Sequence, residues 1–183
     1  MKYYSNLHSD KIIKQHKIVD LNDDEAEKYN SENCSNKLMF SSGTPQLSCG
    51  KYQWGALYNP KNSKTTIYVD SISVVNFSST PIIQSQYLNP KMNYEGFKYM
   101  YGNSNYLEYN LNSNGVVIFY QGNDNLLFPN EANLLKISQP FYTDSSEKNG
   151  NIIIPPGKSI LILITTMNLN NPSCAISYSW WEE

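Results

Sequence analysis

The side chains that could carry nucleophilic or metal chemistry in this sequence are two histidines and three cysteines. They are His8, His16, Cys34, Cys49 and Cys174. A structural zinc site needs about four such ligands at close spacing, and the cysteines form no C-x-x-C pair. A Cys-His or Ser-His-Asp site needs a firmly held histidine, yet both histidines lie in a polar N-terminal segment. We therefore predict no metal site and no nucleophilic catalysis.

The carboxylates and glycines form no catalytic or cofactor motif either. Glu182 and Glu183 are adjacent at the end of the chain, and the run Asp23-Asp24-Glu25 is typical of a solvated helix start. Glycines occur without the G-x-G-x-x-G or G-x-x-x-x-G-K-[ST] spacing that cradles phosphate groups. The sequence predicts a protein that is not an enzyme and that uses no cofactor.

The odd number of cysteines leaves two interpretations open. At least one thiol cannot pair within the chain, which predicts an interchain disulfide or a free thiol. Cys34, Cys49 and Cys174 are then the interchain candidates. The alternative is three unreactive, partly buried thiols, the usual state in a reducing compartment.

Tyrosines are concentrated in the segment Tyr94–Tyr109. In an extended chain, Phe97, Tyr99 and Tyr101 project from one face, and such a row can stack on sugar rings. The alternative is that these rings pair across the sheet and form subunit contacts, which is the commoner use of strand tyrosines. The same applies to Trp181, which follows a core tryptophan and points to the opposite face, where it is a candidate for an interface.

The composition limits the partners of the protein. The 183 residues are 40% hydrophobic and carry a net charge of -2, which gives no electrostatic attraction to nucleic acid or to an anionic membrane. All fourteen basic residues are lysines, so the bidentate grip of arginine on phosphate is missing. No apolar run approaches the roughly 18 residues that span a bilayer, and the N-terminus has no apolar signal-peptide core. We expect neither nucleic acid nor a membrane as a partner.

From residue 37 onward, apolar residues alternate with a period of two, which predicts β-strands. Turn signals separate them every 8–12 residues or so, a pattern typical of an antiparallel two-sheet sandwich or jelly roll. We therefore divide the chain into a flexible arm, residues 1–36, and an all-β sandwich domain, residues 37–183. The only segments that could form one or two helical turns are Asp23–Tyr29 in the arm and Glu131–Leu135. The clearest predicted strands are Thr65–Phe77, Ile82–Leu88, Gly115–Gln121, Asn151–Ile154, Lys158–Thr166 and a last strand after Pro172.

Plain alternation also predicts which side chains share a face. In the strand that begins at Thr65, Ile67, Val69 and Val75 should lie on one face. Ile72 and Val74 should lie on the other. The residues of the last strand that should share a face are Cys174, Ile176, Tyr178 and Trp180.

The arm holds only scattered apolar residues. They are Ile12, Ile13, Ile18, Val19 and Leu21. Such a segment has too little apolar surface to dock firmly on its own domain. In an assembly, Lys11–Leu21 could add as a strand to the open sheet edge of a neighbouring subunit, because backbone hydrogen bonds do not depend on side-chain type.

Four short blocks occur in order along the domain. They are NPKNS (59–63), NFSSTPIIQSQYLNP (76–90), IPPG (154–157) and WWEE (180–183). The blocks resemble the pattern of a family of uncharacterised single-domain proteins from spore-forming Gram-positive bacteria. The resemblance covers most of residues 51–90 and 151–183, and neither the arm nor the tyrosine-rich middle. It implies a β domain and assigns no active site.

The layout of the chain is also similar to that of endospore appendage fibre subunits. Those are small jelly-roll proteins whose flexible N-terminal connector carries cysteines that bond to other subunits. This resemblance implies a self-assembling structural subunit of a fibre or layer, on a spore surface or outside the cell, made without a signal peptide. The alternative is a glycan- or surface-binding sandwich that uses Phe97, Tyr99 and Tyr101, with surface polysaccharide as its partner.

Overall fold

Ten strands make up the regular structure of the part of the chain that is described. The computed structural model describes residues 38–91, 97–104, 112–123, 132–166 and 172–183, and no helix occurs in these ranges. The strands are β1 (Met39–Gly43), β2 (Tyr52–Tyr58), β3 (Ile67–Asn76), β4 (Ile82–Leu88), β5 (Lys98–Ser104), β6 (Asn112–Gly122), β7 (Leu134–Ser138), β8 (Thr143–Ile154), β9 (Ser159–Thr166) and β10 (Cys174–Glu182).

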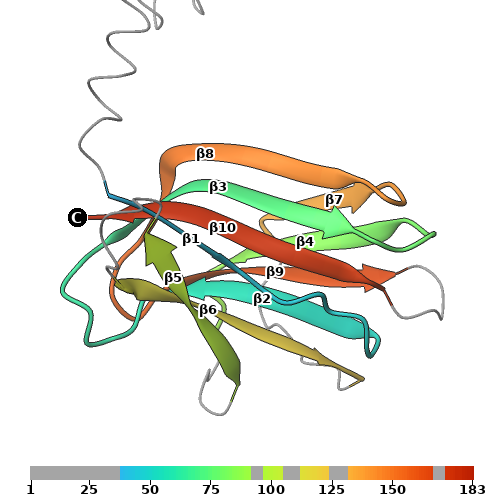
Figure 1. Cartoon of the computed structure of the whole chain (residues 1–183), viewed down its shortest axis with the longest axis horizontal. Helices are drawn as coiled ribbons and strands as arrows, with labels where there is room; N and C mark the ends of the chain where they lie inside the picture. Colours follow the sequence, from blue (N-terminus) through green and yellow to red (C-terminus); the bar gives the residue numbers. More distant parts are fainter. Residues whose placement is uncertain (1–37, 92–96, 105–111, 124–131, 167–171) are drawn as a thin grey trace, which may run out of the picture. The chain divides into compact units, whose positions relative to one another are not determined.

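The ten strands form one antiparallel sheet in the order β7-β4-β9-β2-β6-β5-β1-β10-β3-β8. The sheet curls around its core, so the phenol of Tyr178 in β10 donates a 2.8 Å hydrogen bond to the carbonyl of Gly55 in the non-neighbouring strand β2. The two edge strands β7 and β8 lie side by side as a result (Figure 1). The predicted all-β antiparallel class is confirmed. The division into the two sheets of a jelly roll stays a prediction, because the backbone pairing runs through all ten strands.

The main apolar core lies inside the curled sheet and takes one face of most strands. Ile160, Ile162 and Ile164 of β9 are buried in it. Each buried aliphatic side chain contributes about 1.5 to 3 kcal/mol, so this face supplies most of the stability. The predicted face of the last strand is confirmed, and its buried members are Cys174, Ile176, Tyr178 and Trp180.

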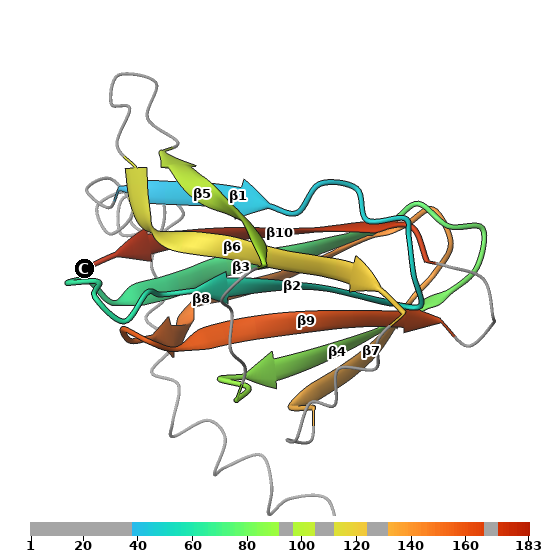
Figure 2. The same cartoon turned by 90° about the horizontal axis from the view of Figure 1, so that it is seen from below.

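A second apolar cluster lies on the outer face of β2, β6 and β9, three neighbouring strands seen edge to edge in Figure 2. Phe97 packs edge-on against Trp54 there, with ring centroids 5.0 Å apart. These strands are therefore buried on both faces, which explains their nearly unbroken apolar sequences. The buried members of the outer cluster are Trp54, Ala56, Val116, Ile118, Leu161 and Leu163.

The predicted faces of β3 were wrong because the strand contains a bulge. Val69 pairs with Trp180 of β10 and Ser71 pairs with the adjacent Ser179, so Asp70 is one extra residue in β3 and moves every later side chain to the other face. The inward side chains are consequently Ile67, Val69, Ile72 and Val74, all buried in the main core. Val75, which alternation had grouped with Ile67, is only partly buried.

Two further predictions need correction. The strand predicted at Asn151–Ile154 in fact begins at Thr143. Asn149 and Gly150, which were expected to form a turn before the strand, lie within β8 and have positive φ angles of 49° and 77°. The helical turn predicted at Glu131–Leu135 is also wrong, since Leu134 and Leu135 begin β7. The predicted bounds of Ile82–Leu88 match β4.

Candidate functional site

A pocket of about 630 Å³ opens on the outer face of the sheet, where β5 and β6 meet three loops. We call it the aromatic pocket. Its volume is in the range of small-molecule sites, roughly 300 to 1,000 Å³. Its lining comprises Tyr58, Pro60, Lys61, Asn62, Ser63, Asn89, Pro90, Tyr99, Tyr101, Ser113, Asn114, Val116, Ile118, Gly157 and Ser159.

Strand register builds the floor of the aromatic pocket. Val116 of β6 lies opposite Tyr58 of β2 and also opposite Tyr101 of β5. Two residues along, Ile118 lies opposite Tyr99. Because side chains alternate across a strand, these residues share the outer face. Aliphatic side chains therefore form a floor, with tyrosines beside it.

The wall of the pocket consists of Tyr99 and Tyr101, which stay 56% and 54% exposed. Their ring centroids are 5.3 Å apart and their planes meet at 83°. A hydrogen bond with the Tyr99 side chain raises the pKa of Tyr101. The pair is therefore a corner formed by one ring face and one ring edge.

The rim of the pocket is held by hydrogen bonds between loops that are distant in sequence. The buried amide of Asn59 donates to the carbonyls of Thr65 and Ile154, at 2.8 and 2.9 Å. The carbonyl of Asn59 accepts from the backbone N–H of Gly157 at 2.8 Å. Asn89, with φ of 50°, donates its N–H to the carbonyl of Ser159 at 2.7 Å. These bonds position the rim before any ligand arrives.

The described lining of the aromatic pocket offers aromatic rings and hydrogen-bonding groups. Its described lining combines tyrosine, asparagine and serine groups with one charged residue, Lys61, and contains no carboxylate or imidazole. A general acid or base of those kinds is therefore absent from that lining. Elsewhere in the described ranges, no group of three or more His, Cys, Asp or Glu residues is placed to hold a metal ion. Nor do these ranges contain a helix long and apolar enough to cross a membrane.

The predicted aromatic residues divide between this pocket and ordinary packing. Tyr99 and Tyr101 line the pocket, whereas Phe97 packs against Trp54 and Tyr120. Trp181 is half-buried and stacks on Tyr68, with ring centroids 5.5 Å apart and planes 4° from parallel.

The two described cysteines differ in access. Cys49 is exposed, whereas the side chain of Cys174 is fully buried and its Sγ lies 3.1 Å from Oε1 of Gln53. Burial raises the pKa of Cys174 to about 12, so its reactive thiolate is scarce. Cys174 is thus a poor interchain partner while the protein is folded. Cys34 and the predicted strand-addition residues of the arm lie outside the described residues.

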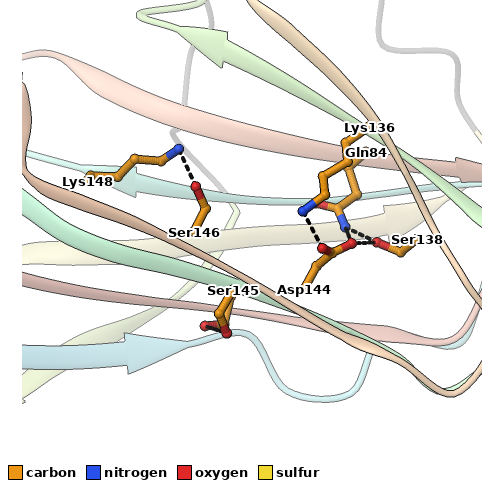
Figure 3. A network of polar contacts seen from close by, with 8 residues as sticks. Gln84, Lys136, Ser138, Asp144, Ser145, Ser146 and Lys148 are labelled. Carbon is orange, nitrogen blue, oxygen red and sulfur yellow. Dashed lines mark hydrogen bonds and ion pairs between the residues drawn. The ribbon is translucent and has the colours of Figure 1, made fainter.

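Side chains bridge the seam between the edge strands β7 and β8, as Figure 3 shows. We call the four residues involved, Gln84, Lys136, Ser138 and Asp144, the seam latch. Lys136 forms an ion pair with Asp144, and the hydroxyl of Ser138 donates to the same carboxylate. The amide of Gln84 donates to Ser138 and, at 3.2 Å, to Asp144. The latch therefore closes a seam that backbone pairing leaves open in the described strands.

Asp144→Asn is expected to lower the free energy of unfolding by about 1 to 2 kcal/mol at neutral pH, because charge-assisted hydrogen bonds are lost. Burial alone would raise the pKa of Asp144, but the bonds from Lys136, Ser138 and Gln84 outweigh it and lower the pKa. This stabilisation is present above the ordinary aspartate pKa of about 3.9 and disappears as pH falls through the lower folded value.

Denaturant unfolding from about pH 5 down to about pH 2 checks the seam latch. The difference between the native chain and Asp144→Asn should shrink toward the acid end. Glu147→Gln is the matched control, because Glu147 is an exposed carboxylate on the same strand. An equal loss in both variants would show that the latch contributes nothing specific.

No sequence pattern indicated the environment of Glu182, which was interpreted only as one of two adjacent carboxylates. Its carboxylate is half-buried and accepts six hydrogen bonds from five residues on three segments of the chain. Two of the donating residues, Ser113 and Asn114, line the aromatic pocket. The donors are Thr65 Oγ1, Ser113 Oγ, Asn114 N and Nδ2, Gly115 N and Trp180 Nε1.

Comparison with known proteins identifies a family and no activity. No curated protein and no solved structure matches the chain. A protein-family match does exist, and it extends through most of the arm and the tyrosine-rich middle, beyond the stretches on which the sequence resemblance rested. The model of this family matches residues 7–183, and the chain therefore belongs to the family of unknown function DUF6143.

Proposed function

We propose that this protein is a non-enzymatic, self-assembling structural subunit of a fibre or layer on a spore surface or outside the cell. The observation that carries the proposal is the open edge of β8. Over its twelve residues, β8 pairs only with β3 among the described strands. The seam latch reaches it through Asp144 alone. The part of this edge beyond Asp144, which the seam latch leaves open, is a template for a strand from another chain.

The proposed donor of that strand is the arm of a second copy, through Lys11–Leu21. Backbone hydrogen bonds would carry the contact, so the few apolar residues of the arm suffice. A covalent link between Cys34 and the exposed Cys49 of the neighbour would slow detachment. We also propose that the domain is a jelly roll, that the protein comes from a spore-forming bacterium, and that it is similar to the subunits of endospore appendages.

Electron microscopy and light scattering of the full-length chain without reductant test the proposal. We expect large ordered oligomers, and ladders on non-reducing gels that collapse in Cys34→Ser and in Cys49→Ser. Cys174→Ser is the matched control and should leave the ladder unchanged, because Cys174 is buried. Deletion of residues 1–36 should give an unconnected domain, with circular dichroism confirming that it remains folded.

Two results would contradict the structural function. One is a monomer at every protein concentration and salt concentration. The other is an arm-deleted variant that still assembles into the same structure, which would remove the arm from the mechanism.

A second candidate function, a glycan- or surface-binding module, is favoured by the aromatic pocket. Two residues of the predicted aromatic row, Tyr99 and Tyr101, line a concave site that also contains amide and hydroxyl groups. Retention of the native chain on insoluble polysaccharide, measured by co-sedimentation, tests this function. Failure to sediment with any polysaccharide would argue against it.

A further inference from the structure

We propose that the aromatic pocket binds a neutral saccharide, with one pyranose ring seated in the corner between Tyr99 and Tyr101. The inference rests on the second candidate function, and it names the ligand class and the residues of the site. A pyranose has apolar C–H faces and a belt of hydroxyl groups. A suitable site therefore offers aromatic surface and several small hydrogen-bonding groups together.

The perpendicular rings decide how much of a saccharide can stack. Coplanar rings along a strand would suit a long flat glycan surface, whereas planes that meet at 83° enclose a single ring. Tyr58, Val116 and Ile118 close the site from below. The corner therefore suits one residue of a chain, or its end, better than an extended crystalline face.

The polar part of the pocket matches the hydroxyl belt. Asn62 and Asn89 are exposed and line the rim, and Asn114 lies at the start of the floor. An asparagine amide both donates and accepts, as each sugar hydroxyl does. Amide Nδ2 of Asn114 is held by Glu182 and Thr65, at 2.9 and 3.2 Å, which fixes that group in place.

The charges at the pocket do not favour an anion, because the carboxylate of Glu182, bonded to the lining residues Ser113 and Asn114, offsets the ammonium group of Lys61. Lys61 is the one charged residue in the described lining, and the chain has no arginine for bidentate capture of a carboxylate or sulfate. The side-chain and backbone hydrogen bonds at Asn59 and Asn89 hold the rim loops in advance, so little ordering opposes binding.

Isothermal titration of the full-length chain, kept reduced, tests the proposal with four soluble probes. They are the tetramers of β-1,4-linked N-acetylglucosamine, β-1,4-linked glucose and α-1,4-linked glucose, and the anionic tetramer of galacturonic acid. We expect saturable binding of at least one neutral tetramer and weaker binding of the anionic one. Tyr99→Ala and Tyr101→Ala should each weaken it roughly tenfold. Asn62→Ala, on an exposed loop, should weaken it by a smaller factor.

Tyr142→Ala is the matched control. Tyr142 is 55% exposed, like the pocket tyrosines. It lies just before β8 and is not among the residues that line the pocket. The affinity of the Tyr142→Ala variant for the neutral tetramers should equal that of the native chain. No heat with any neutral tetramer, or equal affinity in the Tyr99 and Tyr101 variants, would overturn the saccharide site.

The co-sedimentation assay distinguishes failure of the saccharide site from failure of the second candidate function. Retention on polysaccharide that the pocket variants do not change would overturn the pocket and leave surface binding intact. Tetramer binding at the pocket without retention would support the site and argue against a surface-binding function.

Discussion

Trp180→Ala is expected to lower the free energy of unfolding by about 3 to 5 kcal/mol, the cost of removing a fully buried tryptophan. Trp180 has no exposed surface and stacks on Phe40, with ring centroids 6.3 Å apart. A Cβ on Gly102 would come within 2.3 Å of its ring, and one on Gly115 within 3.1 Å. β5 and β6 therefore each place a glycine against Trp180, and neither glycine has a side chain that could fill the cavity that alanine leaves.

Trp181→Ala is the matched control for this prediction. Trp181 is adjacent in sequence but half-buried on the outer face, against Tyr68. Its loss should cost only about 1 to 2 kcal/mol, from one aromatic stack and partial burial. Urea unfolding followed by circular dichroism measures both variants. Equal losses would mean that the two tryptophans do not divide between core and surface as described.

Glu182→Gln is expected to cost about 2 to 3 kcal/mol at neutral pH, because several donors lose a charged acceptor and one amide proton faces other donors. Burial alone would raise the pKa of Glu182. Hydrogen bonds from Ser113, Gly115 and other donors outweigh burial and lower the pKa. The stabilisation is therefore complete above the ordinary glutamate pKa of about 4.3 and is lost as pH falls through the lower folded value.

The pH dependence distinguishes a charge effect from a packing effect at Glu182. Protonated glutamic acid resembles glutamine, so the difference between the native chain and Glu182→Gln should narrow in acid. Glu183→Gln should lose much less, because Glu183 is exposed. Unfolding curves for the three proteins between about pH 7 and about pH 2 give the comparison. A difference that stays constant over this range would assign the loss to packing.

Local alternation in the sequence was enough to predict the all-β class and several strands. Ile82–Leu88 needed no correction, since both ends carry turn residues and its pattern is uninterrupted. The inward face of the last strand was also predicted, because a regular strand turns every second side chain to one side. These features depend only on residues that are close in sequence.

Bulges lay beyond this reasoning, because they depend on the partner strand. The extra residue between Val69 and Ser71 is defined by the pairing of β3 with β10, which local sequence does not specify. The same holds for Asn149 and Gly150. An Asn-Gly pair indicates a turn when it is considered alone, but in the fold both residues have positive φ angles and lie within β8. A single extra residue then reverses the face of every later side chain.

The sequence by itself determined several of the strands, the aromatic alternation at Tyr99 and Tyr101, and the lack of a catalytic motif. The tertiary structure decided which groups meet. Register across β2, β6 and β5 builds the floor of the aromatic pocket, and the rim joins loops that are distant in sequence, such as those of Asn59 and Ile154, which are 95 residues apart. The curl of the sheet brings Glu182 to Ser113 and Lys136 to Asp144. Such contacts depend on how distant strands pair, which periodicity along one strand does not encode.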